Sequence, residues 1–357
     1  MHKRRVRDVR AIIARRCVTL WLMSLGVLAL PTLRAQSELG PVTIGAGLRT
    51  SFDDTRPDSG SSTNQFELND IRLYVNGTLY KDIKFMFNTE YNSATNAVNI
   101  LDAVARVEVS PEFNIWAGRF LPPSDRANLY GPFFANEWNV YTDGVQDGYP
   151  FVFQGRDNGV AYWGTFAKKV KVSAGAFEGK SPTGVPQTIG AARVQIDFWD
   201  PEDGYYLNGT YYGDKNLLAI GGATQEQDGH TASSVDFLLE RKLPKAGVVT
   251  IESEYANYNR LGGYDALYAK SQGAYALGAY LFPKKVGVGQ FQVLGKYAKA
   301  EFTHGTNANY DQKTTEFNLN YVIKQFNARV MSFAQNVKFN RLHTNFWEAG
   351  LGLQVQM

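Results

Sequence analysis

Charged residues two positions apart recur along this sequence of 357 residues. Asp70 and Arg72 are separated by an isoleucine, and Arg106 and Glu108 are separated by a valine. In an extended strand, residues two apart lie on the same face, so these pairs would place charge along one side of a sheet. A unit charge ~6 Å from a passing ion contributes roughly 0.7 kcal/mol in a water-like dielectric. Rows of this kind therefore suit a surface that attracts or sorts ions.

The alternation of polar and apolar residues assigns further charged groups to the same face. The basic groups are Arg72, Lys84, Arg106, Lys171, Arg193, Lys296 and Arg329. The acidic groups are Asp70, Glu90, Asp102, Glu108, Asp197, Asp236, Glu240, Glu252, Glu254 and Glu316. We therefore expect a lining of mixed charge, with a transverse field between acidic and basic walls. The effects of neighbouring positive and negative charges on a passing ion would nearly cancel.

Catalytic and metal-binding chemistry has little support in the sequence. His230, His304 and His343 lie far apart, in or beside predicted loops, without the spacing of metal ligands. An outer-membrane hydrolase could be imagined from Ser173 or Ser253 with His343, but no feature brings these residues together. No phosphate-cradling glycine motif occurs in the chain. We therefore expect neither an enzyme nor a metal or cofactor site.

The elements that would position the charged groups are strands, because the alternation has a period of two. About sixteen segments show it: 42–52, 65–79, 83–91, 100–109, 113–120, 157–166, 170–178, 189–199, 205–212 or 216–226, 235–243, 248–258, 274–282, 288–302, 314–323, 326–340 and 347–357. The least certain part is 200–215, which could be a strand pair and would then give about 18 strands.

The connections between these strands alternate in length. Tight turns at 80–82, 110–112, 167–169 and 244–247 join strand pairs, and longer polar segments such as 179–188 and 304–313 lie between the pairs. Short turns on one rim and long loops on the other are typical of a transmembrane antiparallel β-barrel. A soluble β-sandwich also alternates, but aromatic residues near strand ends, such as Tyr91, Phe120 and Trp199, favour the interfacial girdles of a barrel. We expect an all-β barrel with periplasmic turns and extracellular loops.

The first 35 residues have the order of a secretory signal peptide. Basic residues through Arg16 precede an apolar run over 17–30, and small or polar residues follow, so we expect cleavage after Ala35. Residues 36–357 would then form a single barrel domain. Eight of the 37 basic residues but one of the 34 acidic residues lie in 1–36, which leaves 29 basic and 33 acidic residues, a net charge of −4. Cys17 is the only cysteine, so the exported chain would contain none.

A long insertion at 121–156 separates the fifth and sixth predicted strands. Loops of this length are usually functional or disordered, and its many aromatic residues argue against disorder. We expect it to fold into the barrel as its third loop and to narrow the channel. Its candidate constriction groups are Arg126, Glu137, Asp143, Asp147 and Arg156.

Four segments resemble the phosphate-selective porins O and P and their Gram-negative relatives. The segments are 69–77 (NDIRLYVNG), 118–123 (GRFLPP), 154–160 (QGRDNGV) and 198–202 (FWDPE). The resemblance implies a 16-stranded channel, commonly trimeric, with the third loop folded into the pore. It also implies arrays of lumen-facing Arg and Lys, whereas the exported part of this chain has a net negative charge.

Together these features predict an outer-membrane porin for passive diffusion of small hydrophilic solutes, with anionic, phosphate-like solutes among the candidates. Its expected partners are outer-membrane lipid and lipopolysaccharide, small solutes or anions, and two further copies of the chain in a homotrimer, with no nucleic acid. The alternative is a structural or adhesive barrel that binds a partner through its extracellular loops. A plugged lumen would distinguish that alternative.

Overall fold

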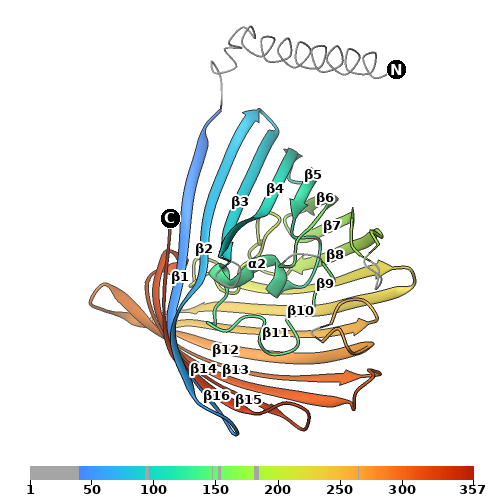
Figure 1. The fold of residues 1–357 in the computed structure, drawn as a ribbon. Coiled ribbons are helices and arrows are strands. Elements are labelled where there is room, and N and C mark those ends of the chain that lie inside the picture. Colours follow the sequence, from blue (N-terminus) through green and yellow to red (C-terminus); the bar gives the residue numbers. More distant parts are fainter. Residues whose placement is uncertain (1–39, 93–95, 147, 152–153, 181–184, 264) are drawn as a thin grey trace, which may run out of the picture. The chain divides into compact units, whose positions relative to one another are not determined.

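The computed structural model describes residues 40–92, 96–146, 148–151, 154–180, 185–263 and 265–357. The expected leader lies outside these residues. The chain divides into two units, Met1–Gly40 and Pro41–Met357, and the second unit is almost entirely β-structure (Figure 1). Within the described part, no helix combines the length and the apolar character needed to cross a bilayer.

Sixteen antiparallel strands form one closed barrel, as the sequence predicts. The strands are β1 (Val42–Pro57), β2 (Thr63–Tyr80), β3 (Ile83–Asn92), β4 (Ala97–Ser110), β5 (Phe113–Phe120), β6 (Asp157–Phe166), β7 (Val170–Phe177), β8 (Ile189–Asp197), β9 (Leu217–Gln227), β10 (His230–Leu243), β11 (Gly247–Asn259), β12 (Lys270–Val286), β13 (Gly289–Thr303), β14 (Tyr310–Lys324), β15 (Ala328–Phe339) and β16 (Phe346–Gln356). Each strand pairs with its neighbours in sequence. The barrel closes between β1 and β16, where Ala46 and Met357 exchange backbone hydrogen bonds of 2.9 and 3.1 Å.

The distribution of side chains is the reverse of that in a water-soluble protein. Along β14, Asn318 and Asn320 are buried, whereas Phe317 and Leu319 between and beside them are 63% and 47% exposed. The same period of two recurs on the other strands, where the large exposed side chains are apolar and the inner face carries the buried charged and polar residues together with apolar ones such as Phe302 and Met331. An antiparallel sheet with an apolar outer face and a polar interior matches a barrel that faces lipid, whereas a β-sandwich would bury its apolar face.

Most connections on the rim that joins β2 to β3 are tight turns, and the opposite rim carries most of the longer loops. The exception on the turn rim is the connection between β8 and β9, which spans 198–216. It is neither a strand pair nor a short turn, so the barrel has 16 strands rather than 18, and β9 is the segment at 217–227 rather than the one at 205–212. On the loop rim, the connection between β9 and β10 is a tight turn at Asp228 and Gly229, because β9 ends at Gln227 and β10 begins at His230.

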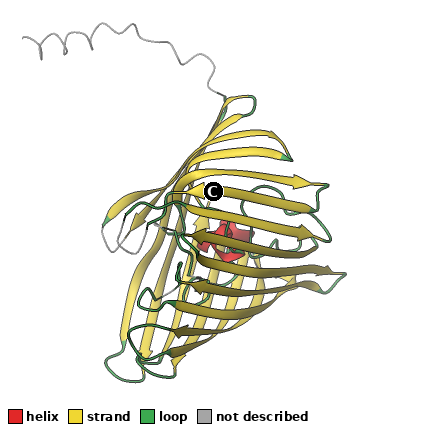
Figure 2. Ribbon diagram, turned by 90° about the vertical axis from the view of Figure 1, so that its right-hand side faces the viewer, coloured by secondary structure: helices red, strands yellow, loops and turns green. Residues whose placement is uncertain are grey.

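Two helical elements occur among the described residues. Helix α2 (Arg126–Phe134) lies inside the barrel, as Figures 1 and 2 show, and the 3-10 helix η1 (Gln325–Asn327) joins β14 to β15. The side chain of Asp125 caps α2 by accepting a 2.7 Å hydrogen bond from the backbone N–H of Asn128. The helix is kinked at Gly131, whose φ is 64°, and Pro132, which has no backbone N–H to donate, follows the kink.

The pairing of β4 with β5 predicts that Gly118 cannot be replaced. Its φ is +130°, and an added Cβ would lie 2.1 Å from the carbonyl oxygen of Ala103. We expect Gly118→Ala to lower the free energy of unfolding by about 1–3 kcal/mol, measured by urea unfolding of the detergent-folded protein. Gly278→Ala is the matched control, because its Cβ would meet nothing within 4 Å. Equal stability of the two variants would contradict the prediction.

Candidate functional site

Two connections fill much of the barrel interior, and they enter from opposite rims. The inward loop (121–156) comes from the loop rim and carries α2, as the sequence predicts for the third loop. The inward segment (198–216) comes from the turn rim. Backbone N–H groups of Leu207 and Gly209 donate to the carbonyl oxygens of Leu129 and Phe134, at 3.3 and 2.9 Å. The two connections therefore form one unit inside the barrel.

The inward loop is attached to the wall formed by β13 to β16. The side-chain oxygen of Asn318 accepts from the backbone N–H of Trp138 at 3.0 Å, and the Arg329 guanidinium donates to the carbonyl oxygen of Ala135 at 2.7 Å. The Trp138 ring stacks on Phe333, with centroids 5.6 Å apart and planes at 11°. The loop also contacts the adjoining strands β1 and β2, since Arg49 donates to the carbonyl oxygen of Trp138 at 2.8 Å and the Arg72 guanidinium lies 5.0 Å from the centre of the Phe133 ring.

Lys296 anchors the middle of the inward loop. Its ammonium lies 2.7 Å from Asp143 and 3.4 Å from Glu137, and it donates a 2.5 Å hydrogen bond to the side-chain oxygen of Gln146. Glu316 on the neighbouring strand accepts from the backbone N–H of Asn139 at 3.3 Å. Glu137 and Asp143 are fully buried. Both constriction candidates thus lie between the inward loop and the wall, where they hold the loop.

A second buried cluster joins the inward loop to the inward segment. Arg126 donates two hydrogen bonds to the Glu202 carboxylate, at 2.9 and 2.5 Å, and both side chains are 0% exposed. Its Nε also lies 3.5 Å from Asp236, which Arg193 holds through contacts of 2.5 and 2.8 Å. Lys171 is buried nearby, and its Nζ has no hydrogen-bond partner in the described part of the chain.

Glu202 is the functional residue that the sequence alone does not reveal. Burial raises the pKa of this carboxyl, but the charge and hydrogen bonds of Arg126 outweigh that effect and bring the pKa to about 2. Tyr211 and Gln195 donate further hydrogen bonds to it, at 2.8 and 2.7 Å. Four tyrosines in one short connection, Tyr205, Tyr206, Tyr211 and Tyr212, are the signal that could have indicated a buried segment rather than a solvated turn.

The pKa of Glu202 predicts a specific dependence of stability on pH. A carboxyl whose pKa is lowered on folding stabilises the fold above its ordinary pKa of about 4.5, and this contribution is lost as the pH falls toward about 2. Glu202→Gln should be less stable than the wild type at pH 7, and the difference should shrink between pH 4.5 and 2. Urea unfolding of both proteins across this range is the measurement. A difference that does not change with pH would contradict the prediction.

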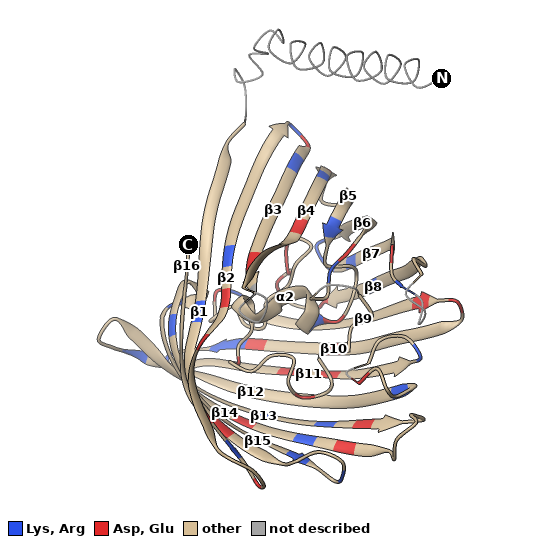
Figure 3. Ribbon diagram, in the orientation of Figure 1, with Lys and Arg blue, Asp and Glu red and all other residues tan. Residues whose placement is uncertain are grey.

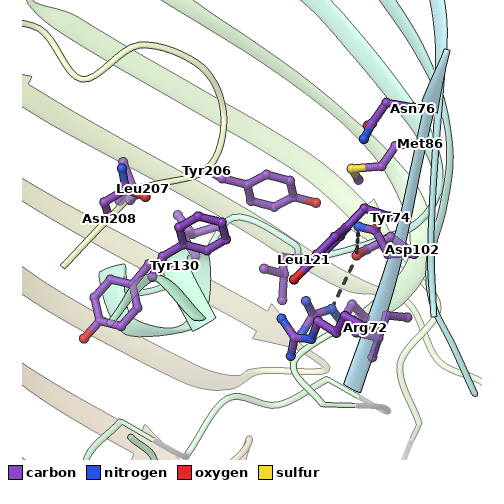
Figure 4. Close-up of a pocket in the computed structure, with 15 residues that line it drawn as sticks. Arg72, Tyr74, Asn76, Met86, Asp102, Leu121, Tyr130, Tyr206, Leu207 and Asn208 are labelled. Carbon is purple, nitrogen blue, oxygen red and sulfur yellow. Dashed lines mark hydrogen bonds and ion pairs between the residues drawn. The ribbon is translucent and has the colours of Figure 1, made fainter. Parts of the chain in front are cut away.

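A cavity of about 250 Å³ remains between the β2 to β4 wall and the two inward connections (Figure 4). Its lining residues are Arg72, Tyr74, Asn76, Met86, Asn88, Leu101, Asp102, Leu121, Leu129, Tyr130, Phe134, Arg156, Tyr206, Leu207 and Asn208. The lining thus comes from three strands, the inward loop and the inward segment.

The charged groups at this cavity are paired. Arg72 contacts Glu90 at 2.9 Å and Asp70 at 4.0 Å. Arg156, from the end of the inward loop, lies 3.5 Å from Asp102. Because each cation has a carboxylate beside it, the local charge is close to balanced.

The remaining candidates also occupy the inner face or lie outside the described residues. Lys84 and Arg106 contact Glu108 at 2.7 and 3.9 Å, on the part of the wall near the turn rim. Glu252 accepts from Tyr130 and Tyr275 at 2.9 and 2.7 Å. Glu254 is buried without a hydrogen-bond partner among the residues that the structure describes. Asp147 lies outside those residues.

Basic and acidic residues are interspersed over the strands of the barrel, as Figure 3 shows. The inward loop covers the acidic groups Glu316 and Glu252 together with Lys296, and it leaves the paired groups of β2 to β4 beside the cavity. The acidic side of the lining is therefore covered by protein, and the balanced side borders the open volume.

No protein-family model matches the chain, and no curated protein matches it. Among solved structures, it is similar to the anion-selective porin of Comamonas acidovorans, with 13% identity, a TM-score of 0.58, and 89% of this chain and 99% of that chain covered. It is similar to Pseudomonas putida OprB, with 9% identity, a TM-score of 0.63, and 88% and 94% covered. The trimer form of OmpT, an outer membrane protein of Vibrio cholerae, has 12% identity and a TM-score of 0.57, with 90% and 100% covered. These similarities show the barrel fold.

Proposed function

We propose that the protein is an outer-membrane porin through which small hydrophilic solutes diffuse passively, anions of the phosphate type among them. The observation that carries the proposal is the closed barrel whose outer face is apolar and whose inner face is charged. Such a barrel has its apolar face toward lipid and lipopolysaccharide and encloses a polar interior. The proposal includes removal of a signal peptide at 1–35, a barrel domain at 36–357 and no enzymatic activity.

The relation to the phosphate-selective porins O and P is part of the same proposal. It is supported by the four sequence segments and by an inward loop at 121–156. Arg72 and Arg156 supply positive charge to the cavity, but Glu90 and Asp102 oppose it. We therefore propose a weak preference for anions rather than a strong one, because adjacent opposite charges nearly cancel. A homotrimer is proposed by analogy with the trimer form of OmpT.

A second candidate function is a structural or adhesive barrel that binds a partner through its loops. One observation favours it. Two connections, the inward loop and the inward segment, occupy the interior and are joined by a buried ion pair, as would be expected of a plugged lumen. The porin remains the better supported function because the wall from β2 to β4 keeps a cavity beside charged groups.

Swelling of liposomes that contain the purified protein separates the two functions. A porin should admit small sugars and amino acids, with rates that fall as solute size increases. A structural barrel should insert and fold equally well but should give liposomes as impermeable as empty ones, and that result would refute the porin proposal.

A further inference from the structure

The lining of the β2 to β4 cavity is unusual for a passage that serves only inorganic ions. Nine of its fifteen residues are apolar or aromatic: Tyr74, Met86, Leu101, Leu121, Leu129, Tyr130, Phe134, Tyr206 and Leu207. A small inorganic anion loses hydration against such a surface and gains little in return. A mostly apolar cavity with a few convergent polar groups is instead typical of a site for a small organic molecule.

The polar atoms at the cavity include several without a partner. Among the described residues, no hydrogen bond reaches Tyr74 Oη, Tyr206 Oη, Asn88 Oδ1, Asp102 Oδ1 or Arg156 Nε. Asp102 and Arg156 are 2% and 7% exposed. Asp102 Oδ1 and Arg156 Nε lie 3.5 Å from each other, whereas the Tyr74 and Tyr206 hydroxyls remain as donors. Buried donors normally have partners, so these hydroxyls indicate a bound group that accepts hydrogen bonds.

Arg156 is the cation best placed to bind an anion there. Arg72 already donates to Glu90 at 3.0 Å through its Nε. Arg156 instead lies 3.5 Å from Asp102 without a hydrogen bond, and among the described residues its guanidinium donates to the carbonyl oxygen of Gln154 at 2.7 Å. A guanidinium with an unused N–H suits a carboxylate, which can accept two parallel hydrogen bonds.

The apolar part of the lining includes residues from both the wall and the inward segment. Figure 4 shows the Tyr206 ring, from the inward segment, directed toward the wall residues Met86 and Tyr74. A cavity of 150 Å³ lined by apolar side chains holds a benzene ring in another protein, so about 250 Å³ leaves room for one ring and a carboxylate. The volume of the cavity and the apolar character of its lining therefore both suit a ligand with one ring and a carboxylate.

We propose that this cavity is a binding site for small organic monoanions, namely carboxylates with an apolar body of about one ring, on the path of the channel. The inference rests on the proposed porin function and narrows it, because it names the solute class that the channel favours. Arg156 binds the carboxylate, and Tyr206 with the leucines of the inward loop contacts the apolar body.

Block of chloride current in planar bilayers tests this inference, with benzoate, acetate and inorganic phosphate as probes. Benzoate should reduce the current at a concentration about tenfold lower than acetate or phosphate does. Arg156→Gln should raise the half-blocking concentration of benzoate about tenfold. Tyr206→Ala should weaken the block by benzoate and leave that by acetate unchanged. Lys81→Gln, an exposed turn position, is the control for loss of one positive charge.

The outcomes distinguish the inference from the function on which it rests. If the channels conduct but the three anions block the current alike, or if neither variant changes the block by benzoate, the proposed carboxylate site is refuted. The proposed porin function is then unaffected. If no variant or wild-type preparation conducts at all, the porin proposal itself fails. If Arg156→Gln does not fold, the Tyr206→Ala variant tests the proposed site by itself, through its block by benzoate compared with its block by acetate. This substitution changes no charge.

Discussion

Arg126→Met should open the channel, with a higher and noisier single-channel conductance than the wild type. The substitution keeps an unbranched side chain of similar length but leaves the fully buried Glu202 carboxylate without its cation. Removing one partner of a buried ion pair costs about 3–5 kcal/mol. The sixteen-stranded wall does not depend on this pair, so the cost falls on the junction between the inward loop and the inward segment. Planar-bilayer recording is the measurement.

Two further variants show whether the effect comes from a buried carboxylate that has lost its ion-pair partner. Arg126→Met combined with Glu202→Gln should restore most of the wild-type behaviour, because replacing both members of a buried pair is often nearly neutral. Lys215→Met removes an ion pair with Asp203 in the same segment, where Asp203 is 79% exposed, and should change little. A conductance for Arg126→Met equal to that of the wild type would contradict the role assigned to this pair.

Removal of the inward segment should increase conductance several-fold. The β8 to β9 ladder continues beyond the strands, since Asp200 donates to the carbonyl oxygen of Asn216 at 3.0 Å and Phe198 to that of Leu218 at 2.8 Å. Residues 201–215 can therefore be replaced by an Asn-Gly turn that joins Asp200 to Asn216, because two-residue turns of this type suit antiparallel hairpins. Arg126 keeps Asp236, 3.5 Å away, as a partner.

The excision also has a matched control on the same rim. Replacing Lys81 and Asp82, the turn between β2 and β3, by Asn-Gly introduces the same turn without removing anything from the interior. This control should conduct like the wild type, whereas the excision should both conduct more and lose the benzoate block. An excised barrel that folds and conducts no better than the wild type would show that the inward segment does not restrict the passage.

The sequence predicts the wall of the barrel well because the relevant signal is local. Phe317 and Leu319 alternate with Asn318 and Asn320, and this period alone determines which side chains point inward. Length and aromatic content similarly indicate that 121–156 is folded rather than a solvated loop. These inferences need no knowledge of which strand lies opposite.

The contents of the barrel could not be predicted in the same way, because they depend on contacts distant in sequence. Parity places Arg193 inward, but its pairing with Asp236 joins β8 to β10. Glu202 meets Arg126 across 76 residues, and the acids that hold Lys296 come from the inward loop. Alternation is misleading at 198–216, because 205–212 has the pattern of a strand but belongs to a connection without strands.

Single-channel recording in a planar bilayer, with reversal potentials in asymmetric salt and with phosphate competing against chloride, tests the central claim most directly. We expect discrete conductance steps that increase with salt concentration and a reversal potential displaced slightly toward that of the anion. A correctly folded, heat-modifiable barrel that inserts into the bilayer and carries no current would contradict it.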